Sequence, residues 1–407
     1  MWTRALGLAD VAAAEQATPD HAYRIGSITK TFTAVCVLQL RDAGRVELDA
    51  PLRSHVPEVP RGPTIRQALA HLSGFQREPP GEIWETLVPP SREELLAGLE
   101  DAERVLAPGA RWHYSNLAFG LLGELVARVS GTSFPDYLAA HVLGPLGLAR
   151  TSLEPSPPAA RGYYVPPWTE AAEPEPDVQL TDTTAALGQL WSTTGDLAAW
   201  GAFIAEGRNG VLAPSTLDEM TRVQVMVDHA GWTVGWGLGL SLTRRGERIF
   251  AGHGGAMPGF LAGLAVQRDE RTGAVVLTGA STGARAEELA VDLAVAALDA
   301  LDRDPVPWVP DAGAPAELQP LLGVWWSEGN ELVIRHRGGR LDIELVGGPK
   351  GRSVSVLVEE APDRFRIVEG RELGELVRVV RDDGGGVVKL YLATYPLTRE
   401  PTTFESA

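Results

Sequence analysis

A strongly apolar run lies close to the start of the chain. Most positions from Phe32 to Leu40 are hydrophobic, and a helix that is apolar all round is typical of a core centre rather than of a surface. The pattern therefore predicts a buried helix over residues 29–43, ending at Gly44, a good C-terminal cap. Apolar residues at helical spacing predict further helices over residues 64–72, 117–130, 192–206 and 285–301.

Beyond the middle of the chain the pattern changes to short apolar runs separated by turns. Residues 247–252, 260–267 and 273–278 are three such runs and predict an antiparallel sheet. Residues 302–317 contain four prolines and predict an interdomain linker. After the linker, strict alternation over residues 341–345 indicates a strand with one buried face. Strands are predicted there over residues 331–337, 340–346, 364–368, 375–381 and 387–394, which suggests a small barrel or sandwich.

Composition narrows the functions that this chain can have. A chain of 407 residues is too long for one ordinary core, so two or three domains are expected. Its formal charge of -17 argues against nucleic acid and anionic membranes as partners. The single cysteine, Cys36, excludes an intramolecular disulfide and is expected in the core. The sequence shows neither a membrane-length apolar run nor a signal peptide, so we expect a cytoplasmic protein, unless an export leader is missing.

Ser27 and Lys30 stand at the predicted start of the buried helix. Because they are three residues apart, they project from the same face, and the hydroxyl and the amine are expected to meet. A lysine beside an apolar helix loses hydration, which lowers its pKa, and a neutral amine can take the proton of a serine. The commoner meaning of an isolated Ser-x-x-Lys is a helix cap and a lysine that reaches water. Partners elsewhere in the chain must decide between the two.

Two further motifs offer such partners. Tyr114 and Asn116 lie on a loop that leads into a predicted helix, where catalytic side chains are often held. Packing of the Tyr114 ring and helix capping by Asn116 are equally open. His253, Gly254 and Gly255 follow the first apolar run of the predicted sheet, and the two glycines let a substrate approach a strand edge closely. His253 could equally be a structural histidine at the end of the strand, and both roles stay open at this point.

A competing nucleophile lies in the G-x-S-x-G motif of residues 279–283. This motif follows a predicted strand and precedes a predicted helix, which is the context of an α/β-hydrolase nucleophile. That fold requires an acid and then a histidine downstream, and the later histidine, His336, lies beyond the linker. The upstream chain also lacks repeated βα units, so this alternative is the weaker one. His71 has no partner at metal-ligand spacing and is expected to be structural.

Taken in order, the motifs resemble those of the serine β-lactamase and penicillin-binding protein superfamily, in particular its class C-like branch with the family VIII esterases and D-aminopeptidases. The stretches YRIGSITKTFTAV, LAHLSGF, PGARWHYSNLAFGLLGELVARVSG, LGPLGL and GHGGAMPGF support this resemblance over roughly residues 1–300. It implies an α+β fold: a β-lactamase-like domain over residues 1–301, in which an antiparallel sheet is flanked by helices and joined to an all-helical subdomain at about 45–185. Residues 318–407, after the linker over 302–317, resemble the lipocalin-like β-barrel domains of some relatives.

The resemblance implies the chemistry of the site. Ser27 is expected to be the nucleophile that forms an acyl-enzyme, and Lys30 and Tyr114 are expected to share the work of general base and acid. The backbone N–H groups of Ser27 and Ala256 are expected to form the oxyanion hole. The reaction that the resemblance implies needs neither a cofactor nor a metal.

The resemblance also implies how substrate is held. Asn116 is expected to bind the acyl side and to help position Lys30, while His253, Gly254 and Gly255 bind substrate along the strand. His253 departs from the lysine of true class C β-lactamases, which helps to hold the carboxylate of β-lactams and of peptide C-termini. A mostly neutral histidine is a weaker partner for an anion. We therefore expect weak or no β-lactamase activity.

The leading hypothesis is a serine hydrolase that cleaves small or peptide-like carboxylic esters or amides through acylated Ser27. Three alternatives stay open: an acyltransferase or peptide cyclase of the penicillin-binding-protein-type thioesterase kind, a β-lactamase or DD-peptidase, and a non-catalytic binding protein. Oligomeric state is open as well. Relatives usually carry a helix and a strand before the strand predicted here over residues 2–8, so either the sheet lacks its usual edge strand or the start is truncated.

Overall fold

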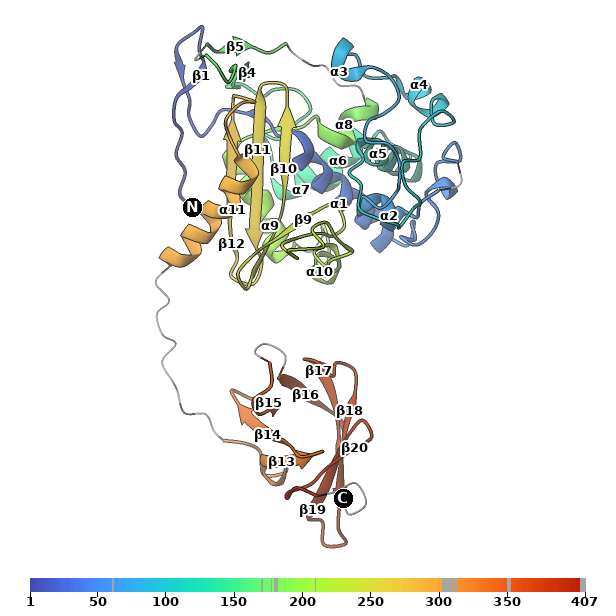
Figure 1. Ribbon diagram of the computed structural model, residues 1–407, viewed down its shortest axis with the longest axis vertical. Helices are drawn as coiled ribbons and strands as arrows, with labels where there is room; N and C mark the ends of the chain where they lie inside the picture. Colours follow the sequence, from blue (N-terminus) through green and yellow to red (C-terminus); the bar gives the residue numbers. More distant parts are fainter. Residues whose placement is uncertain are drawn as a thin grey trace. The chain divides into compact units, whose positions relative to one another are not determined.

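The computed structural model describes residues 1–60, 62–169, 171–176, 178, 182–208, 210–301, 310, 313–349 and 353–402. The chain divides into two compact units, Met1–Asp302 and Arg303–Ala407 (Figure 1). The linker predicted over residues 302–317 lies largely outside the described residues.

The first unit is built on a six-stranded antiparallel sheet with the strand order β12-β11-β10-β9-β8-β7. Its strands are β7 (Val225–Met226), β8 (Val234–Trp236), β9 (Ser241–Arg245), β10 (Arg248–Met257), β11 (Phe260–Gln267) and β12 (Thr272–Thr278). The predictions for β11 and β12 are confirmed, whereas β10 runs on to Met257, so His253 lies inside the strand rather than at its end. The strand expected over residues 2–8 is wrong, because β1 (Leu8–Asp10) instead forms a separate pair with β2 (Glu15–Gln16).

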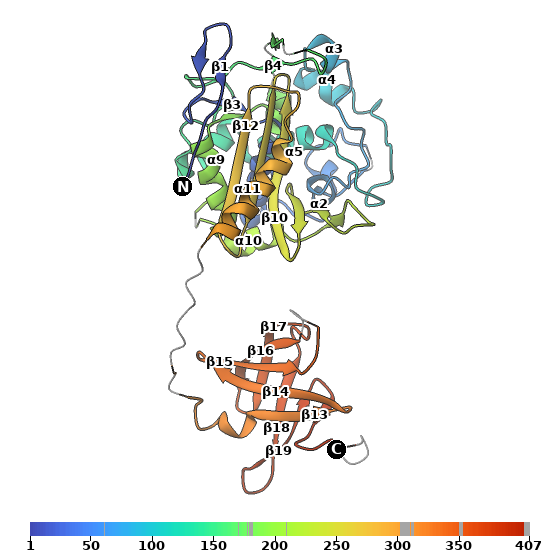
Figure 2. The same cartoon turned by 60° about the vertical axis from the view of Figure 1, so that its left-hand side comes forward.

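Helices cover both faces of this sheet because its central strands are apolar on both sides. In β11, the Cβ that Gly263 lacks would point at Ala286 of α11 (Ala286–Ala300), while Leu264 lies near Gly201 of α9 (Thr194–Glu206). Since neighbouring residues of a strand face opposite ways, α11 and α9 lie on opposite faces. Figures 1 and 2 both show α11 lying across the sheet.

Helix α1 (Thr29–Asp42) is the buried centre of the unit. Its residues from Thr29 to Leu38 are all buried, Cys36 among them, and the Phe32 ring stacks on Trp200 of α9 at 3.8 Å. The prediction of a core helix is therefore confirmed. Helix α1 packs against α5 (Asn116–Ser130), α6 (Phe134–Leu138) and α8 (Asp182–Gly188). Helix α2 (Ile65–Leu69) packs on α5 and α4 (Arg92–Ala97) on α8, and the short helix α3 (Ile83–Thr86) lies between α2 and α4 in the sequence.

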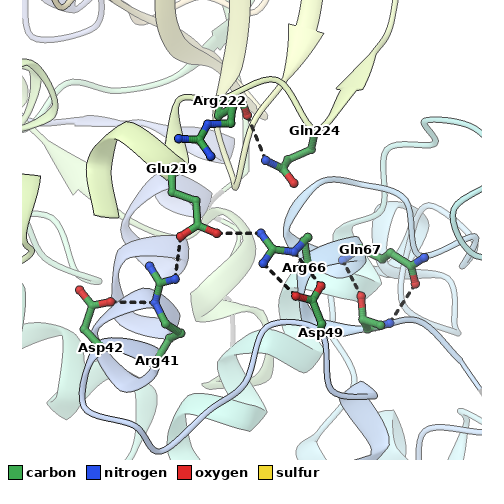
Figure 3. Close-up of polar contacts among 9 residues, drawn as sticks. Arg41, Asp42, Asp49, Arg66, Gln67, Glu219, Arg222 and Gln224 are labelled. Carbon is green, nitrogen blue, oxygen red and sulfur yellow. Dashed lines mark hydrogen bonds and ion pairs between the residues drawn. The ribbon is translucent and has the colours of Figure 1, made fainter. Parts of the chain in front are cut away.

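An ion-pair network ties α1 and α2 to α10 (Pro214–Met220), as Figure 3 shows. Arg41 of α1 donates to one carboxylate oxygen of Glu219 at 2.6 Å, and Arg66 of α2 donates to the other at 2.8 Å. Arg66 also forms a two-pronged contact with Asp49 at 2.7 and 3.0 Å. The carboxylate of Glu219 therefore links three helices at the C-terminal end of α1, the end opposite to Ser27.

The second unit is a nearly closed barrel of eight antiparallel strands in sequential order. Its strands are β13 (Gly323–Ser327), β14 (Asn330–Arg337), β15 (Arg340–Leu345), β16 (Val354–Ala361), β17 (Arg364–Glu369), β18 (Leu376–Arg381), β19 (Val387–Leu392) and β20 (Tyr395–Leu397). Trp326 and Thr398 exchange backbone hydrogen bonds of 2.8 and 3.0 Å, which bring the last strand back to the first. The expected all-β, barrel-like domain is confirmed. Among the described residues of both units, no helix is long and apolar enough to cross a membrane.

Candidate active site

Ser27 lies in a single 3-10 turn, Gly26–Ile28, directly before α1, and is partly exposed. Two glycines allow this turn to touch β10. A Cβ on Gly26, whose φ is +51°, would lie 2.5 Å from the backbone nitrogen of Ala256, and a Cβ on Gly255 would lie 1.9 Å from the carbonyl oxygen of Ile25. Such contacts are far too close for any side chain, so glycine is required at both positions. The turn and the strand thereby bring the backbone of Ala256 beside Ser27.

Lys30 is fully buried one turn along α1. Its Nζ donates to Ser27 Oγ at 3.0 Å and to the carbonyl oxygen of Leu187. Desolvation lowers the pKa of Lys30 to about 7, although the negative charge of Glu78 opposes this shift. Burial thus supplies what the sequence pattern predicted, an amine that is substantially neutral near pH 7 and in contact with the serine hydroxyl.

Tyr114 faces the same hydroxyl from the loop before α5. Its side chain is hydrogen-bonded to Ser27, and its ring centroid lies 5.2 Å from Lys30 Nζ. Desolvation raises the pKa of Tyr114 well above its ordinary value, and the hydrogen bond to Ser27 and the charge of Arg77 only partly offset this rise. At neutral pH the phenol therefore keeps its proton. In this geometry the amine of Lys30 can accept a proton near pH 7, and the phenol of Tyr114 can donate one.

Asn116 is the first residue of α5, and Ser115, not Asn116, caps the helix: Ser115 Oγ accepts from the Ala118 N–H at 3.1 Å. The amide nitrogen of Asn116 donates to both carboxylate oxygens of Glu78, at 2.8 and 2.9 Å. Among the described residues, its buried Oδ1 has no hydrogen-bond partner. Lys30 directs its own hydrogen bonds to Ser27 and Leu187. Glu78 lies in none of the sequence motifs, so the sequence alone does not predict it at this site.

His253 projects from β10 toward Tyr114 and is buried. Its ring lies 6.1 Å from that of Tyr114 and 5.3 Å from that of Trp236, and Nδ1 is 2.5 Å from the carbonyl oxygen of Gly254, to which it donates. Desolvation and the charge of Lys30 lower the pKa of His253 to about 3, so the ring is neutral at physiological pH. Gly254 beside it is partly exposed and Ala256 is exposed. The strand therefore offers backbone groups rather than a positive charge.

His71, which we expected to be structural, also contacts the loop that carries Tyr114. Its Nδ1 accepts the Ser115 N–H at 3.1 Å, its carbonyl oxygen accepts the His113 N–H at 2.8 Å, and its ring lies 4.2 Å from that of Tyr114. The residue is fully buried with a φ of +55°, a strained conformation for a non-glycine residue. His71 therefore fixes the backbone on both sides of Tyr114.

The competing nucleophile has no comparable surroundings. Ser281 lies between β12 and α11, where its hydroxyl makes a long contact of 3.5 Å with the carbonyl oxygen of Tyr163. His336 is part of β14 in the second unit. Among the described residues, no group of three or more His, Cys, Asp or Glu side chains is placed to hold a metal ion.

An antiparallel sheet, a helical part and a Ser-x-x-Lys helix buried between them define a serine hydrolase fold of the β-lactamase and penicillin-binding protein superfamily. The chain belongs to the Beta-lactamase family, whose sequence model matches residues 1–298. Residues 314–399 match a second family, described as a domain of unknown function, DUF7586.

Individual relatives agree with this assignment. The chain is 33% identical over 192 residues to D-alanyl-D-alanine-carboxypeptidase/endopeptidase AmpH of Escherichia coli, a match that covers 44% of this chain and 48% of AmpH. It thus spans about half the length of the curated relatives it matches. A D-stereospecific amidohydrolase from Streptomyces sp. superposes with a TM-score of 0.55 at 30% identity, covering 64% of this chain and 83% of that one. D-amino acid amidase from Ochrobactrum anthropi, complexed with L-phenylalanine amide, superposes with a TM-score of 0.58 at 25% identity, covering 72% and 88%.

Proposed function

We propose that this protein is a serine hydrolase that cleaves small carboxylic esters or amides through an acyl-enzyme on Ser27. The observation that carries the proposal is the contact of 3.0 Å between Ser27 Oγ and the buried amine of Lys30, whose pKa is lowered to about 7. A hydroxyl beside a neutral amine in a dry site is an activated nucleophile. Lys30 and Tyr114 approach this hydroxyl together, as general acid–base catalysis requires.

The proposed reaction has two stages. Lys30 accepts the proton of Ser27, Oγ bonds to the substrate carbonyl carbon, and the N–H groups of Ser27 and Ala256 hold the developing oxyanion. The carbonyl then re-forms, and the bond to the leaving group breaks as Tyr114 donates its proton; the proton held by Lys30 restores the phenol. In the second stage these steps run in reverse, with water in the place of the leaving group. Tyr114 passes its proton to Lys30 and takes one from the attacking water, and Lys30 returns its proton to Ser27 Oγ as the acid leaves.

The position of Glu78 narrows the range of acyl groups that we propose the site accepts. Its partly exposed carboxylate lies against the amide of Asn116, on the side where the acyl group is expected, and Arg77 approaches it at 3.5 Å. A carboxylate there suits an acyl group that carries an amino group, such as an aminoacyl ester or amide. The names of the Streptomyces and Ochrobactrum proteins support D-amino acid amides as the first substrates to test.

A substrate panel tests the proposal: p-nitrophenyl esters, D-amino acid amides and a chromogenic cephalosporin, each with the wild type, Ser27→Ala and Tyr114→Phe. We expect ester turnover to fall at least about a hundredfold in both variants, a typical loss for such groups, and cephalosporin turnover to be slow because His253 is neutral. Intact mass spectrometry should show one acyl group on the wild type. Full activity of Ser27→Ala would refute the proposal.

The same panel addresses the acyltransferase alternative. An added amine should leave the hydrolysis products unchanged, whereas a new amide in its presence would show that the acyl group passes to an acceptor other than water.

A further inference from the structure

The edge of β10 next to Ser27 is open on one side. Strand β9 pairs with β10 only as far as Gly252, which lies opposite Ser241, whereas β11 pairs with it along the whole stretch from Ala251 to Met257. In the described part of the sheet, β10 from His253 onward therefore has a strand on one side only. Ala256 on this stretch lies against the turn that carries Ser27. A substrate held at Ser27 can extend from there along the open edge, past Gly254.

Glu287 lies beside this edge, in the first turn of α11. Its Oε2 is only 2.4 Å from the place that a Cβ on Gly254 would occupy, and its Oε1 is 3.4 Å from Ser241 Oγ. The start of α11 is pressed onto β11, because a Cβ on Gly263 would lie 2.2 Å from the carbonyl oxygen of Ala286. Glu287 is nevertheless exposed, and its charge acts on Tyr114. The carboxylate is thus held near the reacting groups and can be reached from solvent.

The charges around this end of the site leave a negative charge exposed. Arg285, just before α11, pairs with Glu288 at 2.5 Å, and His253 on the strand is neutral. In the family that the motifs resemble, a lysine stands at the position of His253 and helps to hold the carboxylate of peptide C-termini, which in peptide cleavage belongs to the leaving group. Here the lysine is absent and a carboxylate stands beside the next residue of the strand.

We propose that Glu287 determines specificity for the leaving group: it disfavours leaving groups with a negative charge and favours neutral or cationic ones. This inference rests on the proposed hydrolase function. A like charge beside a partly desolvated carboxylate is repelled and an opposite charge attracted, and at a site open to water the effect is about five- to tenfold in affinity for each ionic group. Substrates with a free carboxylate on the leaving side are therefore expected to be poor ones.

Three acetate esters that differ only in the charge of the leaving group test this inference: 3-carboxyphenyl acetate, 3-carbamoylphenyl acetate and 3-(trimethylammonio)phenyl acetate. Each kcat/KM is divided by the rate constant of alkaline hydrolysis, which removes differences in intrinsic reactivity. Desolvation raises the pKa of Glu287, although contacts with Ser241 and the Gly254 backbone oppose the rise, so the assays are run at pH 8. Full-length wild type is compared with Glu287→Gln and with Glu288→Gln, a matched change on the neighbouring residue.

We expect the ratio of anionic to neutral ester turnover to rise about five- to tenfold in Glu287→Gln, and the ratio of cationic to neutral to fall by a similar factor. In Glu288→Gln both ratios should change less than about twofold. High salt should reduce the charge preference of the wild type, because mobile ions screen exposed charges.

A proportional change for all three esters in Glu287→Gln would overturn the inference, since it would mean that Glu287 only supports the fold. If the neutral ester is hydrolysed and Ser27 is acylated while the ratios stay constant, the inference fails and the hydrolase proposal stands. If no ester is hydrolysed and Ser27 is not acylated, the hydrolase proposal fails and the inference fails with it.

Discussion

At the scale of single residues, the burial of Lys30 sets the electrostatics of the candidate site. An ammonium group enclosed by α1, α5 and α8 has lost the water that would stabilise its charge, and the negative charge of Glu78 restores only part of that stability. The balance places the pKa of Lys30 at about 7, within the physiological range. The same burial raises the pKa of Tyr114 and keeps its proton in place, so one environment favours the neutral form of both groups.

The rate of acylation should therefore depend on pH through Lys30. Below pH 7 the amine is protonated and cannot accept the Ser27 proton, so kcat/KM for a neutral ester should fall about tenfold per pH unit and level off above pH 7. Stopped-flow measurement from pH 5 to 9 gives the midpoint. Lys30→Arg, which stays protonated throughout, should lose at least about a hundredfold in rate at every pH. A flat wild-type profile would contradict the role of Lys30 as base.

His71 is predicted to act as a positioning residue for Tyr114. Its Nδ1 accepts the Ser115 N–H, so its proton lies on Nε2, and protonation of Nδ1 would break this contact. Asparagine offers an acceptor near the position of Nδ1 and tolerates a positive φ, whereas glutamine places its acceptor further out. We expect His71→Asn to keep kcat within about tenfold, and His71→Gln to lower it about thirtyfold or more with little change in KM.

Urea unfolding of both His71 variants provides the control. Equal loss of stability with unequal loss of kcat would support positioning of Tyr114, while equal losses of both would leave His71 a purely structural residue.

At the scale of elements, Glu219 joins α10 to α1 and α2 (Figure 3). Desolvation raises its pKa, but the hydrogen bonds from Arg66 and Arg41 outweigh this effect and hold the pKa of Glu219 below its ordinary value. A depressed folded-state pKa contributes stability above the unfolded value of 4.5, and this stability is lost as the pH falls through the folded value.

Glu219→Gln should therefore lower the free energy of unfolding by about 1–2 kcal/mol at pH 7. The difference from wild type should shrink as the pH falls below 4.5. Asp49→Asn is the comparison, because that side chain is 76% exposed against 22% for Glu219, so its loss should cost less. Denaturant titrations at pH 7 and at pH 4 measure both variants, and a difference for Glu219→Gln that grows at low pH would contradict this account.

At the scale of the whole molecule, the two units have separate hydrophobic cores. The core of the first unit surrounds α1, and that of the second lines the barrel around Trp325. Trp325 is fully buried, its Nε1 donates to the Leu321 carbonyl oxygen at 2.7 Å, and the Arg399 guanidinium lies 3.8 Å from its ring centroid. Two separate cores lead us to expect that unfolding of the full chain is not two-state.

Calorimetry of the full chain should therefore resolve two transitions. Trp325→Ala should destabilise one of them by about 3–5 kcal/mol, the cost of emptying a large buried site, and leave the other in place. Cys36→Ala, a buried change in α1, should shift the other transition instead. A single transition that both variants shift equally would show that the two units unfold together.

Many of the longer helices and strands could be predicted from the sequence, because their formation depends mainly on residues a few positions apart. The period of apolar residues predicted α5 and α11 to within a residue or two, and β11 with its observed bounds. Strands β8, β9, β13, β16 and β20 went unrecognised, since they are short or lack a clear alternation and form only when a neighbouring strand supplies hydrogen bonds. The ordered motifs likewise predicted that Ser27, Lys30 and Tyr114 would meet, and they do.

Tertiary structure alone decided the electrostatics of the site. Lys30 has a lowered pKa because residues distant in the sequence enclose it, and Glu78 and Glu287 reach the site from segments that carry no motif. Hydrophobic periodicity and residue spacing act over a few positions, so the sequence by itself determined the longer helices and pointed to Ser27, Lys30 and Tyr114 as candidate site residues. Desolvation and Coulomb interactions act through space, so only the folded chain determined which groups of the site are charged and which are neutral.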